Sequence, residues 1–351
     1  MKKKTKKQKW VKLISTLFFI LLNVAVIIIT ATSEFGNSET AAELSEVKIV
    51  WWLLLLALGC FILATIIDIY RYKLMLKKAG GVKDKKKINS VARRTVLIGK
   101  YYDNITPAAI GGQPFQIYYM NKNGGVRSGM ATTIPIMGMI SSQIGFLIVA
   151  IIIFIIGAGA INNLALVSTA CLGLLFYAFW PVTIIGMVFF PKIMTSVIKV
   201  VIKIGEKMHL IKNKNEAYGK IENGVKDYVK SFKEILKSRG LFFRTVLFSV
   251  LFHILIGSIP FFVLTAFGGN VDFFSTFAIT VAVTSAVYFI PTPGNSGAAE
   301  GTFFAVFSSL SSGYVFWAML IWRLLIYYSY IILGPIEYLM MHFEKKHGKI
   351  G

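Results

Sequence analysis

The stretch PTPGNSGAAEG at residues 291–301 interrupts an apolar run that extends from 273 to 312. A related stretch, NITPAAIGGQP at 104–114, interrupts a second apolar run at 95–120. In both stretches a Thr-Pro pair is followed by glycine, four residues after the proline. Proline and glycine end or kink helices, so each run predicts a helical hairpin that is broken in its middle.

The composition excludes the common soluble classes. The 351 residues carry 38 Lys and Arg against 16 Asp and Glu, a net charge of +22, yet 56% are hydrophobic and only 15% are charged. Soluble domains carry about 25% charged residues, and disordered chains are far less apolar. Cys60 and Cys171 both lie in apolar runs and form no metal or disulfide motif. No P-loop, Rossmann or zinc-protease pattern is present, so we expect no catalytic residues, no metal and no cofactor.

Long apolar runs predict membrane-spanning helices, because about 20 apolar residues cross the hydrocarbon core. We expect six full spans, near 13–32, 49–70, 129–157, 164–190, 241–266 and 314–341. The first follows seven lysines and resembles a signal peptide. Its apolar part exceeds the usual 7–15 residues or so and no A-x-A site follows, which favours a retained anchor.

The positive charge sorts by side of the membrane. Lysine and arginine gather in the N-terminal segment, in 71–100, at Lys122 and Arg127, in 192–244 and in the C-terminal tail. These segments hold 36 of the 38 basic residues, and the positive-inside rule makes all of them cytoplasmic. Both termini are then cytoplasmic. The basic excess therefore reflects topology, and a nucleic-acid partner is not expected.

With these sides fixed, both interrupted runs must enter and leave the membrane on one face. The run 95–120 dips from the cytoplasmic side and 273–312 from the outside. We therefore predict a single all-α polytopic membrane domain, 1–351, with two opposed re-entrant hairpins in an inverted repeat whose halves are 1–160 and 161–342. Inverted repeats with broken helices are typical of transporters, with the site where the breaks meet.

The predicted site is a polar cavity between the two breaks, because non-helical backbone at membrane depth must line protein or water. Half-helix N-termini there favour an anion such as a lipid phosphate. Arg323 is the predicted phosphate partner, and Glu300 the partner of an amine or a proton. A buried ion pair between the two, and loops that are simple hairpin tips, remain open alternatives. The predicted headgroup residues are Lys100, Asp103, Asn104, Thr106, Pro107, Gly111, Gly112, Gln113, Thr292, Pro293, Asn295, Ser296, Glu300 and Arg323.

Other polar residues receive simpler interpretations. Asp68, Arg71 and Glu337 are expected at the cytoplasmic interface, and His253 as a hydrogen-bonded packing residue. Asp103 with Asn104 is a candidate helix cap. The basic cytoplasmic linker 192–240 contains a helical apolar stripe among lysines, which predicts an interfacial helix on anionic lipid.

The two breaks also resemble known signature motifs. GKYYDNITP at 99–107, continuing through GGQPFQIY at 111–118 to Lys122, and PTPGNSGAAEG at 291–301 resemble those of the lysylphosphatidylglycerol synthase transmembrane (flippase) family. The resemblance implies a multi-pass protein of the bacterial cytoplasmic membrane. It implies movement of a phospholipid, aminoacylated (lysyl) phosphatidylglycerol or a related lipid, to the outer leaflet, where it protects against cationic antimicrobial peptides.

The resemblance has one departure. Full-length family members carry a large soluble transferase domain, whereas about ten residues follow the last predicted span here. We therefore expect a non-catalytic protein, although the family label would be phosphatidylglycerol lysyltransferase. That activity, another membrane-embedded lipid transferase, and a partner subunit of a separate lipid synthase remain alternatives. A homo-oligomer also remains open.

Overall fold

A computed structural model describes residues 48–107, 109–156, 164–193, 214–288, 290–309 and 314–346, with Ile28, Thr32, 195–196, 199–200 and 203. This part of the chain is helical and contains no strand. Its elements are α3 Trp51–Ala79, α4 Lys85–Ile105, α5 Gly112–Lys122, α6 Ser128–Ile156, α7 Leu164–Phe189, α9 Lys214–Lys237, α10 Arg239–Ala266, α11 Phe273–Val287, α12 Ala298–Ser308, α13 Val315–Arg323, the π-turn η1 Leu324–Tyr328 and α14 Ser329–Lys346.

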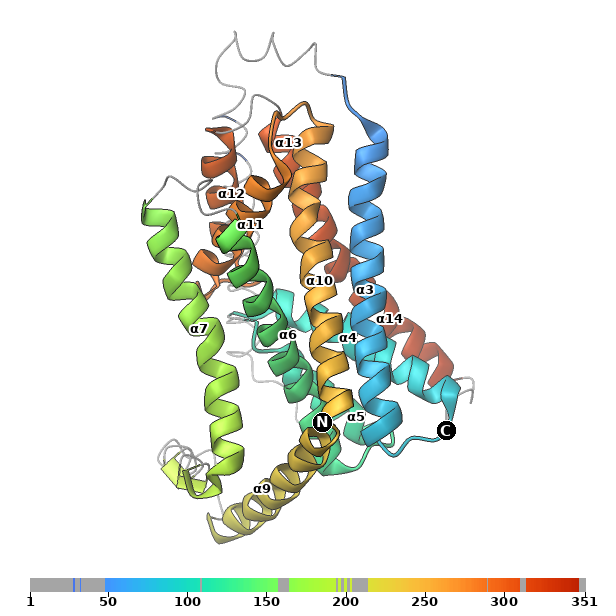
Figure 1. Cartoon of the computed structure of the whole chain (residues 1–351). Coiled ribbons are helices and arrows are strands. Elements are labelled where there is room, and N and C mark those ends of the chain that lie inside the picture. Colours follow the sequence, from blue (N-terminus) through green and yellow to red (C-terminus); the bar gives the residue numbers. More distant parts are fainter. Residues whose placement is uncertain are drawn as a thin grey trace, which may run out of the picture.

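Five of the predicted spans are present as long apolar helices. They are α3, α6, α7, α10 and the continuous unit of α13, η1 and α14 (Figure 1). The span predicted at 13–32 lies outside the described residues apart from Ile28 and Thr32. α3 runs on to Ala79, because its last turns hold helix-forming lysines and no breaker precedes Gly80. An all-α polytopic membrane fold is thus confirmed.

Both interrupted runs form broken hairpins. α4 and α5 approach from the end of the molecule where α9 lies, and α11 and α12 from the opposite end (Figure 1). Asp272 caps α11 by accepting the Ser275 N–H at 2.9 Å. Hydrogen bonds from Ser275 keep the pKa of the Asp272 carboxyl below its usual value. The second break differs from the prediction, since helix α12 already begins at Ala298 and therefore carries Glu300.

The hairpin tips meet in the structure. Pro107 and Pro293 form an isolated antiparallel β-bridge, although 186 residues separate them in the chain. Each proline belongs to the Thr-Pro pair that marks its break, so the two related sequence motifs lie against each other. This contact places the polar break residues of both hairpins close together.

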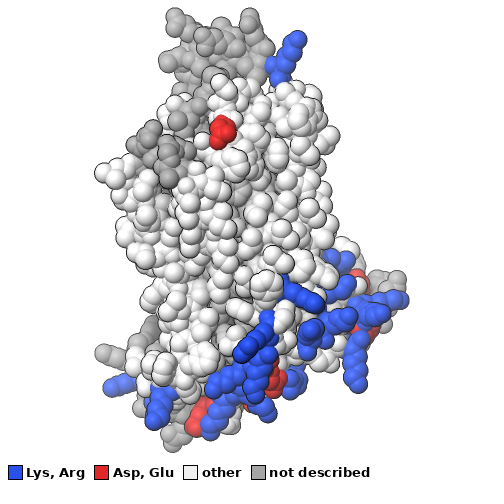
Figure 2. Space-filling model, viewed as in Figure 1, with Lys and Arg blue, Asp and Glu red and all other residues white. Residues whose placement is uncertain are grey.

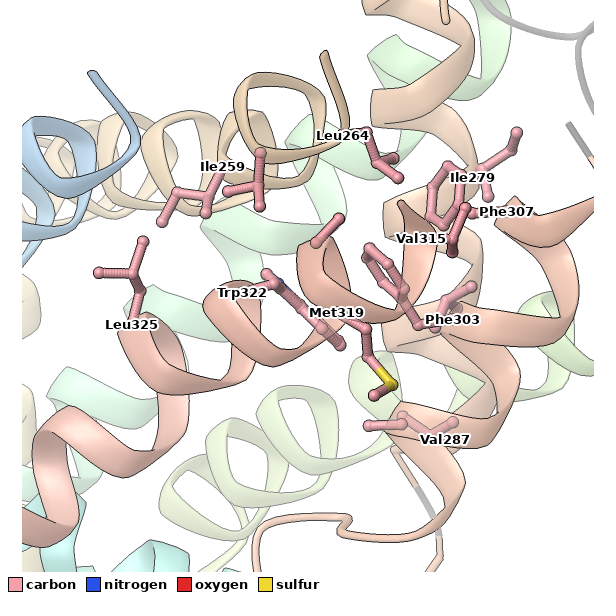
Figure 3. Close-up of a cluster of buried hydrophobic side chains, with 14 of the residues drawn as sticks. Ile259, Leu264, Ile279, Val287, Phe303, Phe307, Val315, Met319, Trp322 and Leu325 are labelled. Carbon is pink, nitrogen blue, oxygen red and sulfur yellow. The ribbon is translucent and has the colours of Figure 1, made fainter. Parts of the chain in front are cut away.

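A buried apolar cluster fixes α12 against α13. Phe303 stacks on Trp322 with ring centroids 4.6 Å apart, and Ile259 and Leu264 of α10 belong to the same cluster (Figure 3). Phe303 is 1% exposed and Trp322 4% exposed. Burial of such aromatic side chains dominates packing energetics. Because Glu300 and Arg323 are close in sequence to Phe303 and Trp322, this packing brings their charged groups together.

We expected the apolar stripe of α9 to rest on lipid, and this expectation is wrong. Tyr228, Phe232 and Ile235 are buried within a protein core that includes α3, α4 and α6. The approach is close, since a Cβ on Gly129 of α6 would lie 2.5 Å from Ser231 Oγ. The helix is amphipathic as predicted, but the partner of its stripe is protein, and Lys226, Lys230, Lys233 and Lys237 are exposed.

The charged surface is concentrated at one end of the molecule. Lysine and arginine side chains gather over the end that contains α9, and the visible middle carries none (Figure 2). A band without charges of this kind suits the hydrocarbon core of a membrane.

Candidate functional site

The second hairpin tip is organised by a buried ion pair. Arg323 Nε lies 2.7 Å from Glu300 Oε1, and the side chains are 4% and 5% exposed. The other carboxylate oxygen, Oε2, accepts the N–H of Gly297 at 2.7 Å. Gly297 is the N-cap of α12, and Glu300 occupies its first turn, where a carboxylate also complements the helix dipole. One carboxylate therefore balances both Arg323 and the start of this half-helix.

Arg323 also holds the loop of the tip. Its Nη2 donates to the carbonyl of Gly294 at 3.2 Å and to Ser296 Oγ at 3.1 Å. Its guanidinium carbon lies 4.3 Å from the centroid of the Tyr327 ring, at cation–π distance. The contact seen is the ion pair that the sequence left open as an alternative. The lipid contacts predicted for Arg323 and Glu300 stay predictions.

The loop conformation depends on glycine at one position. Gly294 has φ of +58°, and a Cβ there would lie 2.0 Å from Tyr327 Cε2. Asn295 follows with φ of +56°, a conformation that asparagine tolerates better than most residues. Thr292 Oγ1 donates to the carbonyl of Ser296 at 3.0 Å and closes the turn. A side chain at position 294 would therefore force Tyr327 to move.

The first hairpin tip repeats the capping by a carboxylate. Asp103 Oδ1 accepts the N–H of Gly112, the first residue of α5, at 2.9 Å. Thr106 Oγ1 donates to the carbonyl of Tyr102 at 2.7 Å and accepts the Gly111 N–H at 2.9 Å. The predicted capping role of Asp103 is confirmed. At each half-helix start one N–H group already binds an acidic side chain, and anion binding at these starts stays a prediction.

Tyr327 joins the two tips. Asn104 Nδ2 donates to the Tyr327 carbonyl at 3.2 Å, and the Tyr327 hydroxyl donates to the Asn104 carbonyl at 3.3 Å. Tyr327 lies in the π-turn that follows Arg323, and such turns are frequent at functional sites. Sequence reasoning missed this residue. Its position four residues after Arg323, on the same helical face, was the available signal.

The remaining predicted residues lie around this centre. Gln113 and Asn295 are half-buried at the two tips, and Pro107 and Pro293 form the bridge between them. Lys100 is the exception, because its ammonium lies 5.4 Å from the centroid of the Phe252 ring of α10 rather than at the break.

Two further buried ion pairs correct the sequence interpretation. Asp68 and Arg71 lie 2.7 Å apart with side chains 3% and 5% exposed, and Arg71 also donates to Ser249 of α10. Glu337 Oε1 accepts Arg94 Nε at 3.1 Å, which ties α14 to α4. These residues are core groups and not the simple interface residues expected.

Arg94 was missed because it lies within a basic segment. The available signal was its place on the apolar face of α4, three residues after Val91. His253 is a hydrogen-bonded packing residue as predicted, and its partner is the Ser142 hydroxyl at 3.1 Å.

Apolar spans around a polar centre define a polytopic membrane protein with two broken hairpins. The family model described as the Lysylphosphatidylglycerol synthase TM region matches residues 13–334, nearly the whole chain. The chain therefore belongs to this family, and its function concerns membrane lipid. A comparison with curated proteins finds no match.

Proposed function

We propose that the protein moves a phospholipid between the leaflets of the bacterial cytoplasmic membrane. The proposed cargo is aminoacylated (lysyl) phosphatidylglycerol or a related lipid, and its exposure outside would contribute to resistance against cationic antimicrobial peptides. The observation that carries the proposal is the meeting of two broken hairpin tips, Pro107 against Pro293, beside a buried charged pair. Buried charges and broken helices at membrane depth are typical of transport sites.

The ion pair supports a headgroup that carries both signs of charge. Removing one member of a buried pair leaves the other uncompensated, at a cost of about 3–5 kcal/mol. A headgroup with a phosphate and an amine can bind Arg323 and Glu300 at once, so neither charge is left alone. This exchange favours an aminoacylated lipid over an anionic lipid without an amine.

The tips must separate for a headgroup to pass. The bridge and the reciprocal Asn104–Tyr327 hydrogen bonds join the two tips. Each is a neutral or partly exposed contact of the kind that contributes about 0.5–1.5 kcal/mol. We propose that the halves 1–160 and 161–342 form the inverted repeat whose relative movement opens them, with the basic end of the molecule cytoplasmic.

Purified protein in liposomes tests the proposal. Labelled phosphatidylglycerol and its lysyl ester are placed in one leaflet, and their appearance in the other is followed by quenching from outside. We expect faster transfer of the lysyl ester than in protein-free liposomes, with the Gly301→Ala variant as a folded control. Equal rates with and without protein would refute lipid movement.

Two further measurements separate the alternative functions. A new lipid species detected by mass spectrometry when the protein alone is expressed would indicate a lipid transferase. Co-purification with a soluble synthase, without transfer in liposomes, would indicate a partner subunit.

A further inference from the structure

One half-buried carboxylate at the hairpin tips differs from the buried ones. In the described helices Asp68, Glu300 and Glu337 each lie within 3.1 Å of an arginine nitrogen. Asp103 has no lysine or arginine of the described chain at ion-pair distance, and its recorded partner is the N–H of Gly112. It is therefore the carboxylate at the hairpin tips whose charge the described protein leaves without a paired cation.

Asp103 is half-buried in the last turn of α4. Lys100, one turn before it on α4, contacts Phe252, which follows the start of α10 at Arg239 by 13 residues. At 1.5 Å per residue that is about 20 Å along a helix long enough to cross the membrane. The Lys100 ammonium lies over this aromatic ring and forms no ion pair with Asp103, although its charge acts on that carboxylate.

None of the described groups that act electrostatically on Asp103 forms an ion pair with it. They are Lys100 from α4, Asp68 and Tyr72 from α3, and Tyr288 after α11. Asp68 is a like charge and is already paired with an arginine, and the tyrosines are neutral hydrogen-bonding groups.

A buried carboxylate without a cation partner is stabilised by taking up a proton, and intramembrane acidic residues of this kind form proton relays. Protonation would also change the helix it caps. The neutral acid is a weaker acceptor than the carboxylate, so the Gly112 N–H and the start of α5 become available to another anion.

We propose that Asp103 is a proton-binding site that couples lipid movement to the proton gradient. A proton entering from one side forms an O–H bond on the Asp103 carboxyl, and the phosphate of the headgroup then takes over the Gly112 N–H. The return of the carboxylate to this N–H releases the proton to the other side and displaces the phosphate. This inference rests on the proposed function, because it assigns a driving force to the same site.

The first experiment imposes a pH difference across liposomes that contain the protein and labelled lysyl-phosphatidylglycerol. One proton per lipid predicts a shift of up to about tenfold in the lipid distribution per pH unit. The Asp103→Asn variant keeps an acceptor for Gly112 and should show no shift. The matched control is Asp84→Asn at the N-cap of α4, outside the membrane, where Asn caps equally well. A gradient effect that survives in Asp103→Asn overturns the proposal.

The second experiment is independent of transport. Infrared difference spectra of the solubilised wild-type protein between about pH 5 and pH 9, where ordinary carboxyls are ionised, should contain a carboxylic-acid C=O band. This band should be absent from Asp103→Asn and present in Asp84→Asn. An unchanged band in Asp103→Asn overturns the proton site even if lipid is moved. A band that behaves as expected without any lipid transfer supports the proton site and refutes the proposed function.

Discussion

Removing one charge of the Glu300–Arg323 pair should destabilise the protein far more than removing both. In Arg323→Met, the Glu300 carboxylate keeps only the Gly297 N–H, and the tip loop loses the donors to Gly294 and Ser296. We expect a loss of about 3–5 kcal/mol in the free energy of unfolding. Glu300→Gln leaves the Arg323 charge uncompensated in turn, and its amide can accept only one of the two N–H groups that Glu300 accepts, so we expect a similar loss.

The double variant Glu300→Gln/Arg323→Met removes both charges and leaves a pair of similar volume. We expect it to regain most of the stability lost in Arg323→Met, because no buried charge is then uncompensated. Tryptophan fluorescence of the solubilised protein during thermal or denaturant unfolding measures these differences. The exposed pair Arg127–Glu234, 3.2 Å apart with side chains 65% and 40% exposed, is the matched control and should contribute less than about 1 kcal/mol.

Additive losses in the double variant would refute the reasoning that the two charges compensate each other. The liposome assay then separates structure from function. The double variant should fold and insert but transfer no lysyl-phosphatidylglycerol, because its site no longer carries either charge. Transfer at the wild-type rate would show that this pair is a packing device and not a headgroup site.

Two further predictions concern packing. Gly294→Ala should cost more than about 1 kcal/mol, because a positive φ and Tyr327 leave no room for a Cβ, whereas Gly301→Ala on the open face of α12 should be neutral or stabilise by up to about 1 kcal/mol; unfolding midpoints compare them. Phe232→Ala should cost about 3–5 kcal/mol and expose α9 to protease, while Lys233→Ala should change stability by less than about 0.5 kcal/mol. Protection of α9 in Phe232→Ala would contradict its packing on α6.

The spans and the broken hairpins could be predicted because they depend on local sequence. Apolar runs of sufficient length identified the long helices, and Pro with Gly marked both breaks. The partners of the buried charges could not be predicted. Arg323 pairs with Glu300 because Phe303 stacks on Trp322, and that packing between distant segments leaves no local signal.

Two other failures have the same origin. The stripe of α9 has the same pattern whether it faces lipid or protein, so only the structure distinguishes its burial against α6. The half-helix starts were expected to be free, but one N–H group of each binds an acidic residue of the motifs themselves. Glu300 three residues after Gly297 has the spacing of a capping box, which was a readable signal. Asp103 lies nine residues before Gly112, and this spacing gives no such signal.

The central claim is that the two hairpin tips separate during lipid movement. Cysteines at Pro107 and Pro293, in a variant with Cys60 and Cys171 replaced by serine, test it most directly. Bridged residues have Cα atoms about 4.5–5.5 Å apart, within the range a disulfide spans. We predict that oxidation stops the transfer of labelled lysyl-phosphatidylglycerol in liposomes and that reduction restores it. Equal transfer by the cross-linked and reduced protein would contradict the account.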